Sequence, residues 1–150
     1  MKYDMEAAIP HRAPFLLVDE VLEVDGGRIS AAVTLRPDDE LWSRIYAGHY
    51  PGNPITPGVL ILEMLFQAAG IMIGESLKGE PLPGVPVVTR ITNVKFRNMV
   101  RPGDRVELAA SLAERLGNAF YCKGTAKTGG KTAVQAEFAL ALADPDASRQ

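Results

Sequence analysis

The sequence is poor in cysteine and carries little net charge of either sign. Its one cysteine, Cys122, has no second cysteine to pair with, so no internal disulfide can form. The formal net charge is -2 at pH 7, and no basic run or cluster of basic residues among aromatics occurs, so the composition does not indicate a nucleic-acid partner. Residues 1–12 are charged and lack the long apolar region of a signal peptide. We therefore expect a cytoplasmic protein.

Long hydrophobic runs are also missing. The most apolar segment, residues 59–73, is interrupted by Glu63 and Gln67 and is shorter than the about 20 apolar residues that a membrane-spanning helix needs. We expect it to be a buried helix and expect no membrane insertion. With 150 residues, 47% hydrophobic and 23% charged content, and no repeat or long linker, the chain is typical of a single globular domain over residues 1–150. Residues from about 144 to 150 are expected to form a loose tail.

Alternating apolar residues bounded by turn signals predict six strands. The first two form a hairpin around the turn at residues 25–27 and cover residues 15–24 and 28–35. A strand over residues 87–96 is followed by a turn at residues 101–104. The last three strands form a meander with turns at residues 117–118 and 129–130, and their alternation is clearest over residues 106–112 and 134–142. The strands therefore indicate a mainly antiparallel sheet.

One helix is expected between the second and third strands. Thr56 is a good N-cap residue and Pro57 suits the first helical position, so the first turn is expected to begin around Gly58. Residues 59–73 are apolar nearly all round, which is typical of a helix enclosed by protein. One long buried helix against an antiparallel sheet is an α+β arrangement, with the sheet wrapped around the helix. This is the shape of a hot-dog fold.

Two polar residues on this apolar helix are candidates for chemistry. Glu63 and Gln67 lie one turn apart on the same face, so their side chains can touch. Loss of solvation favours the protonated form of a carboxyl group, so Glu63 could act as a general acid. The alternative is a partly exposed glutamate that pairs with a glutamine and has no catalytic role.

The loop before the helix carries further candidates. His49 lies in "AGHYPGNP", where prolines and glycines restrict the backbone path and suit it to hold a catalytic group. The Gly58 N–H, in the first helical turn, has no intrahelical partner and could bind a developing oxyanion. The alternatives are a surface histidine and a helix end bonded to water or to Thr56. His11, in "HRAPFLLVD", is a weaker candidate than His49.

These residues occur together in "HYPGNPITPGVLILEMLFQ", which resembles the active-site motif of the β-hydroxyacyl-acyl carrier protein dehydratases of FabZ type. In that family a histidine followed by Phe/Tyr-Pro-Gly precedes a Pro-Gly-Val helix start, with a glutamate in the helix and a glutamine one turn later. His49, Gly58, Glu63 and Gln67 occupy those positions. The resemblance extends to "IPHRAPFLLVDEVLEVDGG" and "VKFRNMVRPGDRVEL" and so covers residues 9 to about 142.

The chain also departs from the family pattern. Thr56 stands where the family usually has methionine, and Met64 and Phe66 replace small residues. We expect these changes to affect the substrate tunnel and therefore the acyl-chain preference. Glutamate rather than aspartate at position 63 points away from the related dehydratase-isomerase branch.

The resemblance implies reversible dehydration of a (3R)-3-hydroxyacyl thioester on acyl carrier protein to the trans-2-enoyl thioester, in fatty acid or related lipid or polyketide biosynthesis. It implies that neutral His49 takes the C2 proton, protonated Glu63 gives a proton to the departing hydroxyl, and the Gly58 N–H binds the thioester oxygen. The Ile55 carbonyl would orient His49 and Gln67 would position Glu63. No metal or other cofactor is required.

The resemblance also implies a homodimer, with His49 from one chain and Glu63 from the other in each site, and it allows three dimers to form a hexamer. Carrier proteins are typically acidic, so a basic group in a segment with one acidic residue is a candidate docking surface. Its members are Arg90, Lys95, Arg97, Arg101 and Arg105, and the alternative is a set of ordinary solvated charges. Two other functions stay open, a hot-dog acyl thioesterase and a non-catalytic acyl-binding subunit.

Overall fold

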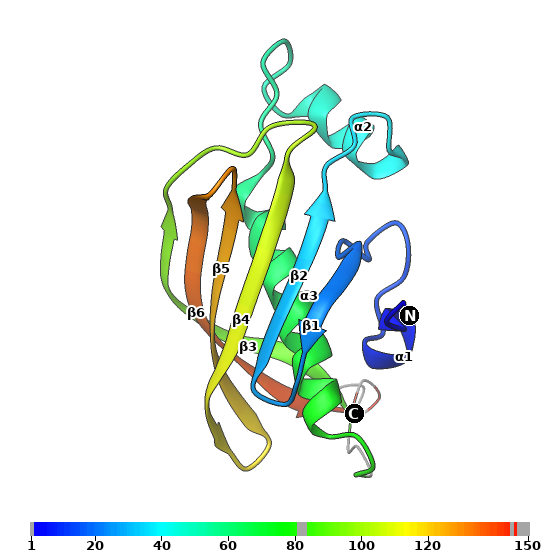
Figure 1. Ribbon diagram of the computed structural model, residues 1–150, viewed down its shortest axis with the longest axis vertical. Coiled ribbons are helices and arrows are strands. Elements are labelled where there is room, and N and C mark those ends of the chain that lie inside the picture. Colours follow the sequence, from blue (N-terminus) through cyan, green and yellow to red (C-terminus); the bar gives the residue numbers. More distant parts are fainter. Residues whose placement is uncertain (1, 81–83, 145, 147–150) are drawn as a thin grey trace.

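The computed structural model describes residues 2–80, 84–144 and 146. Most of the expected loose tail, residues 145 and 147–150, lies outside the described residues. The described chain forms one antiparallel sheet of six strands in the order β1-β2-β4-β5-β6-β3, so β1 and β3 are its edges. The strands are β1 (Glu20–Val24), β2 (Arg28–Thr34), β3 (Val85–Phe96), β4 (Arg105–Leu116), β5 (Ala119–Thr128) and β6 (Lys131–Ala143). The six predicted strands are thereby confirmed (Figure 1).

The hairpin of β1 and β2 turns where the sequence predicts, because the Asp25 carboxylate accepts the N–H groups of Gly27 and Arg28. Its first strand, however, begins at Glu20 and not at residue 15. The backbone at Phe15 and Leu17 bonds to a glutamine side chain on the core helix and not to a neighbouring strand. Residues 15–17 therefore belong to a loop fastened to the helix.

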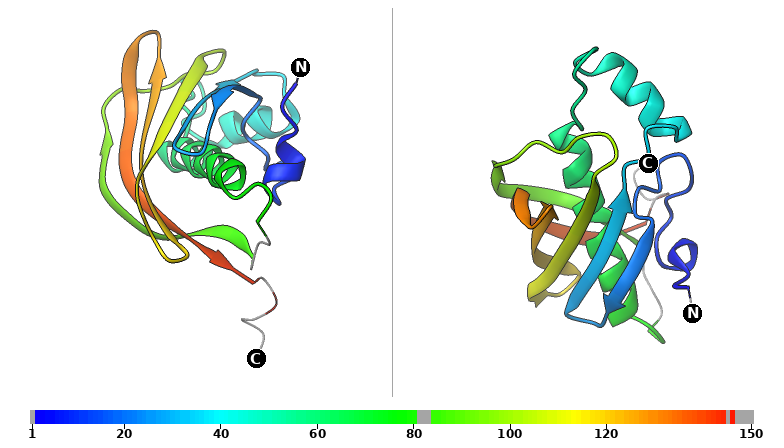
Figure 2. Two further views of the ribbon diagram at one scale, coloured as in Figure 1. Left: turned by 60° about the horizontal axis from the view of Figure 1, so that its bottom comes forward. Right: turned by 45° about the horizontal axis from the view of Figure 1, so that its top comes forward.

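The core helix, α3 (Gly58–Ser76), lies inside the curve of the sheet, which wraps around it (Figure 2). By length and composition alone, this 19-residue helix with a mean hydropathy of 1.5 could cross a membrane. In the fold, 61% of that stretch is buried, and Met64, Leu65 and Ile71 are completely enclosed. The predicted buried helix and the α+β hot-dog arrangement are both confirmed.

The predicted N-cap of this helix is wrong. Pro57 occupies the N-cap position, and no side chain caps the helix. The Thr56 hydroxyl is instead 2.8 Å from the Tyr46 hydroxyl in a buried hydrogen bond, and its backbone N–H donates to the Val100 carbonyl. Because the Thr56 hydroxyl is turned toward Tyr46, it is not available to the first N–H groups of α3.

Two helices were not predicted. The short α1 (Met5–Ala8) lies near the N-terminus. The second, α2 (Glu40–Gly48), follows β2 and precedes α3 along the chain, and it lies beyond the end of the sheet that is uppermost in Figure 1. Asp39 caps α2, since its carboxylate accepts the N–H groups of Leu41 and Trp42. Trp42 and Tyr46, four residues apart, bury the inner face of α2. This helix ends at Gly48, directly before His49, and so fixes where the loop that carries His49 begins.

Candidate active site

His49 is fixed at the C-terminal end of α2. Its backbone N–H donates to the Ile45 carbonyl, and its ring nitrogen Nδ1 lies 2.8 Å from the Ile55 carbonyl oxygen. A carbonyl oxygen only accepts hydrogen bonds, so Nδ1 carries the proton in the neutral ring. Nε2 is then unprotonated and has its lone pair free. This geometry provides a base held in one orientation.

A tight turn brings Ile55 back to His49. Tyr50 has a φ of 57° and Gly52 a φ of +88°, and the Asn53 N–H bonds to the Tyr50 carbonyl at 3.1 Å. Gly52 tolerates this left-handed conformation because it has no Cβ. The Tyr50 ring meets the His49 ring edge-on, with 4.8 Å between ring centroids. The Pro- and Gly-rich sequence of the loop is thus matched by a backbone that reverses direction.

Gly58 begins α3 directly after this loop. A Cβ at this position would lie 2.5 Å from Cε1 of Phe96, so the Phe96 ring occupies the space that a side chain would need. Within the described part of the chain, no hydrogen bond satisfies the Gly58 N–H. An apolar hollow of about 430 Å³ adjoins it, lined by Ile55, Thr56, Gly58, Val59, Ile61, Phe96, Arg97, Asn98, Met99, Val100 and Val134. Gly58, whose N–H has no partner among the described residues, therefore lines a space large enough for a ligand.

Glu63 and Gln67 meet as predicted. Gln67 Nε2 donates to Glu63 Oε2 at 2.9 Å and also to the Phe15 carbonyl at 2.7 Å, while Gln67 Oε1 accepts the Leu17 N–H at 2.8 Å. Because the Leu17 N–H can only donate, the orientation of this amide group is determined. Gln67 is 1% exposed and the Glu63 side chain is 22% exposed. A buried, fully bonded glutamine thus holds a glutamate that still reaches the surface.

His11 joins this second group, although sequence reasoning ranked it low. Its Nε2 lies 3.4 Å from Glu63 Oε2. Its position in "IPHRAPFLLVD" gave no signal of this contact, because the bonds of Phe15 and Leu17 to Gln67 exist only in the folded chain. A single loop histidine far from the glutamate in sequence gives no local sign of such a contact.

The predicted site residues therefore form two groups. His49, Ile55 and Gly58 form one, and Glu63, Gln67 and His11 form the other. Glu63 lies five positions after Gly58, which corresponds to about 140° around the helix and roughly 7.5 Å along it. Across the described residues, no hydrogen bond or ion pair links the two groups. Gly58 and Glu63 therefore lie on different sides of α3.

The three departures from the family pattern have different surroundings. Thr56 lines the hollow beside Gly58 and bonds to Tyr46. Met64 is fully buried in the core, and the Phe66 ring packs edge-on against Phe138 of β6 at 5.0 Å. Of the three, only Thr56 adjoins the hollow, and an effect of any of them on acyl-chain preference stays a prediction.

The predicted basic group is divided by the structure. Arg97 lines the hollow, and Arg101 donates to the Asn53 side chain of the histidine loop at 2.9 Å. Arg105 instead forms an ion pair with Glu20 of β1, with 2.7 Å between nitrogen and oxygen. Arg90 and Lys95 lie on the exposed edge strand β3. Arg97 and Arg101 are the members next to the candidate site.

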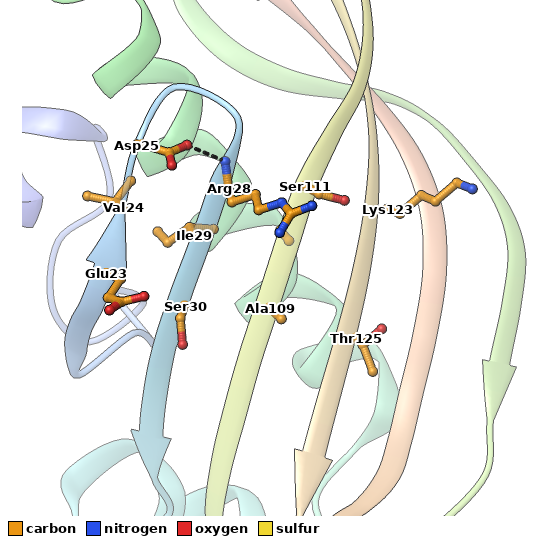
Figure 3. A pocket seen from close by; sticks show the side chains of 11 residues that line it. Glu23, Val24, Asp25, Arg28, Ile29, Ser30, Ala109, Ser111, Lys123 and Thr125 are labelled. Carbon is orange, nitrogen blue, oxygen red and sulfur yellow. Dashed lines mark hydrogen bonds between the residues drawn. The ribbon is translucent and has the colours of Figure 1, made fainter.

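A larger hollow of about 780 Å³ lies elsewhere, on the outer face of the sheet (Figure 3). Arg28, Ser111 and Lys123 project from this face, while α3 lies behind the sheet. None of the predicted catalytic residues lines it. The smaller hollow beside Gly58 is therefore the one that fits the predicted chemistry. Among the residues that the structure describes, no group of three or more His, Cys, Asp and Glu is placed to hold a metal ion.

The fold and site together define a hot-dog protein with a histidine loop before the core helix and a glutamate within it. The chain belongs to the family of the FabA-like domain, whose model matches residues 9–137. It is 42% identical over 142 residues to a protein of Rhizorhabdus wittichii named 3-hydroxyacyl-acyl-carrier-protein dehydratase FabZ, covering 93% of this chain and 87% of the relative. A protein of the same name from Campylobacter jejuni is 37% identical, covering 93% and 95%. The resemblance to FabZ-type dehydratases is confirmed.

Solved structures show the same fold at low sequence identity. A chain of the dehydratase heterocomplex ApeI:P from Xenorhabdus doucetiae superposes with a TM-score of 0.81 at 18% identity, covering 97% of this chain and 94% of the other. A hypothetical thioesterase protein with coenzyme A from Streptococcus pneumoniae superposes with a TM-score of 0.64 at 9% identity, covering 93% and 91%. At these identities the likeness extends to the fold alone.

Proposed function

We propose that this protein is a (3R)-3-hydroxyacyl-acyl carrier protein dehydratase that forms trans-2-enoyl thioesters in fatty acid or related lipid or polyketide biosynthesis. The observation that carries the proposal is the identity of 37% and 42%, over nearly the whole chain, to two relatives named as such dehydratases. Acyl carrier protein is then the partner that brings the substrate, and the cytoplasm is the compartment.

The reaction requires a base, an acid and a hydrogen-bond donor for the thioester oxygen. The two sets of site residues supply all three. His49 Nε2, freed by the bond from Nδ1 to Ile55, takes the C2 proton. The electron pair of the broken C2–H bond forms the C2–C3 double bond, and the C3–O bond breaks as protonated Glu63 gives its proton to the departing hydroxyl. The unpaired Gly58 N–H donates to the thioester oxygen, where negative charge grows. This elimination is redox-neutral and needs no cofactor.

We further propose a homodimer in which each site takes His49 from one chain and Glu63 from the other. Gly58, which begins α3 directly after the His49 loop, and Glu63 lie on different sides of the helix, and this supports a second copy as the source of the partner residue. The edge strand β3 has twelve residues and pairs on one side only. Such an edge is a template for pairing with another chain. Its apolar side chains Val87, Val88, Ile91 and Phe96 are exposed.

Activity is tested by incubating the purified protein with 3-hydroxyacyl and enoyl thioesters of several chain lengths and following the products by mass. Interconversion of the two thioesters is the expected result. Release of free acid would instead identify a thioesterase, and no turnover at any chain length would identify an acyl-binding subunit. Either of these results would overturn the proposed function.

The shared site is tested by mixing unfolded His49→Ala and Glu63→Gln chains and refolding them together. A heterodimer with shared sites contains one doubly defective site and one intact site. With random pairing, half of the dimers are mixed and half of their sites work, so about a quarter of wild-type activity should return. If each chain supplies both residues to its own site, activity stays at the mutant level even when mass analysis detects mixed dimers.

Docking of the acidic carrier protein is assigned to Arg97 and Arg101, which lie beside the hollow and the histidine loop. Replacing both by glutamate should raise KM for carrier-bound substrate and leave KM for a small thioester analogue unchanged. Arg105→Glu is the matched control, since Arg105 is paired with Glu20. Equal effects on both substrates would contradict the docking role.

A further inference from the structure

The proposed mechanism uses one of the two histidines of this chain and leaves the other without a role. His11 is nevertheless directed at the acid, because its Nε2 lies 3.4 Å from Glu63 Oε2. The same oxygen accepts the hydrogen bond from Gln67 Nε2 at 2.9 Å. Two nitrogen atoms therefore converge on one oxygen of the carboxyl group.

The position of His11 is set by the loop that carries it. Gln67 bonds to this loop at Phe15 and at Leu17, and so fastens it to α3. The Phe15 ring stacks with the His11 ring at 6.4 Å between centroids. The Arg12 guanidinium donates to the carbonyl groups of Ile9 and His11. His11 thus faces Glu63 because its backbone is fixed.

Burial of the other ring nitrogen indicates which tautomer His11 adopts. Nδ1 is buried and has no hydrogen-bond partner among the described residues. A buried N–H without an acceptor is rarer in proteins than an acceptor that lacks a donor. In the neutral ring the proton therefore sits on Nε2, the nitrogen that faces Glu63. Glu63 Oε2 then accepts the hydrogen bond from Gln67 at 2.9 Å and has the His11 N–H as a second, longer polar contact at 3.4 Å.

Two donors on Oε2 decide which oxygen of the neutral acid carries the proton. An O–H group at Oε2 would confront both N–H groups, so the proton is placed on Oε1, for which the described residues provide no partner. We propose that His11 is a positioning residue that, with Gln67, keeps Oε2 as an acceptor and so directs the Oε1 proton at the departing hydroxyl. This inference rests on the proposed dehydratase function.

The same two donors assist the reaction as it proceeds. The Oε1 proton passes to the hydroxyl, which leaves as water with the electron pair of the C3–O bond, and Glu63 becomes a carboxylate. The hydrogen bond from Gln67 strengthens when its acceptor becomes charged, and the His11 N–H at 3.4 Å adds electrostatic attraction, so both N–H groups stabilise the carboxylate as its charge develops. Exchange with solvent then returns a proton to Glu63 and removes one from His49.

Matched substitutions test whether the Nε2–H matters. His11→Gln places an amide N–H the same number of bonds from Cβ as the imidazole Nε2, whereas His11→Met has the same length and no donor. We expect His11→Met to lower kcat by about tenfold or more with little change in KM, and His11→Gln to recover most of the loss. His11→Phe, which keeps a ring against Phe15, should behave like His11→Met and controls for packing.

The outcomes separate the two proposals. If the wild-type protein interconverts the thioesters and His11→Met keeps wild-type kcat, the role of His11 is overturned while the proposed function stands. Equal losses in His11→Gln and His11→Met, with unchanged melting temperatures, would overturn it too, since the N–H would then be irrelevant. If the wild-type protein does not interconvert the thioesters, the proposed function itself fails. The His11 side chain is 29% exposed, so all three variants are expected to fold.

Discussion

The hydrogen bond between Tyr46 and Thr56 leads to a prediction about stability. The two hydroxyl oxygens lie 2.8 Å apart, and Tyr46 and Thr56 are only 7% and 4% exposed. The bond connects α2, which ends at His49, to the loop residue beside the Ile55 carbonyl that orients the His49 ring. We expect Thr56→Val and Tyr46→Phe each to destabilise the protein, because each leaves one buried hydroxyl without a partner.

The size of the effect follows from this loss. Leaving a buried hydroxyl unsatisfied costs about 1–3 kcal/mol, and valine has nearly the shape of threonine, so no cavity adds to the cost. For a chain of this length, each kcal/mol corresponds to a change of about 2–4 °C in Tm. In the double variant both hydroxyls are absent and no unpaired group is left. Its free energy of unfolding should therefore lie closer to wild type than that of either single variant.

The assay is denaturant and thermal unfolding of the wild type, both single variants and the double variant at one protein concentration, since association raises the apparent stability of an oligomer. A favourable coupling free energy of about 1 kcal/mol or more is expected from the double-mutant cycle. Simple addition of the two single losses in the double variant would refute the reasoning. Thr56→Ser, which keeps the hydroxyl, serves as the control and should retain the coupling.

Three further predictions concern activity and pH. His49→Ala and Glu63→Gln should each lower turnover by about a hundredfold or more with Tm nearly unchanged. Retained turnover in either variant would contradict the proposed mechanism. Gly58→Ala should lower kcat because its Cβ would displace the Phe96 ring, and Phe96→Ala in the same chain should restore part of the activity if that clash is the cause. Burial raises the pKa of Cys122 from 9.0 to about 11, so the contribution of Cys122 to the unfolding free energy should be constant below pH 9 and fall as pH rises from 9 to 11, and Cys122→Ala should reduce the fall seen over this range.

The strands and the core helix were predictable because their signals are local. Alternating apolar residues and glycine-containing turns mark the meander of β4, β5 and β6, and the register of these strands follows that alternation. The apolar residues on all sides of α3 predict that the helix is buried. In contrast, α2 was missed although Asp39 caps it and Trp42 and Tyr46 follow at helical spacing, because its nine residues give few turns in which a helical period can be recognised.

The N-cap prediction failed for a different reason. Thr56 has the right residue type in the right place, but its hydroxyl bonds to Tyr46, and the propensity of a residue for a cap does not reveal competing partners. The single-domain organisation, the homodimer and the catalytic roles of the site residues stay predictions, as does the loose tail, most of which lies outside the described residues.

The sequence by itself determined the residue types of the site, the spacing of Gly58, Glu63 and Gln67 on one helix, and the rigid loop that carries His49, since all of these depend on neighbours along the chain. The tertiary structure alone decided that His11 faces Glu63 and that Phe96 covers Gly58. It also decided that, among the described residues, no hydrogen bond or ion pair joins His49 to Glu63. Contacts of this kind join residues far apart in sequence, and they form only when the sheet closes around the helix and brings separate loops to its surface.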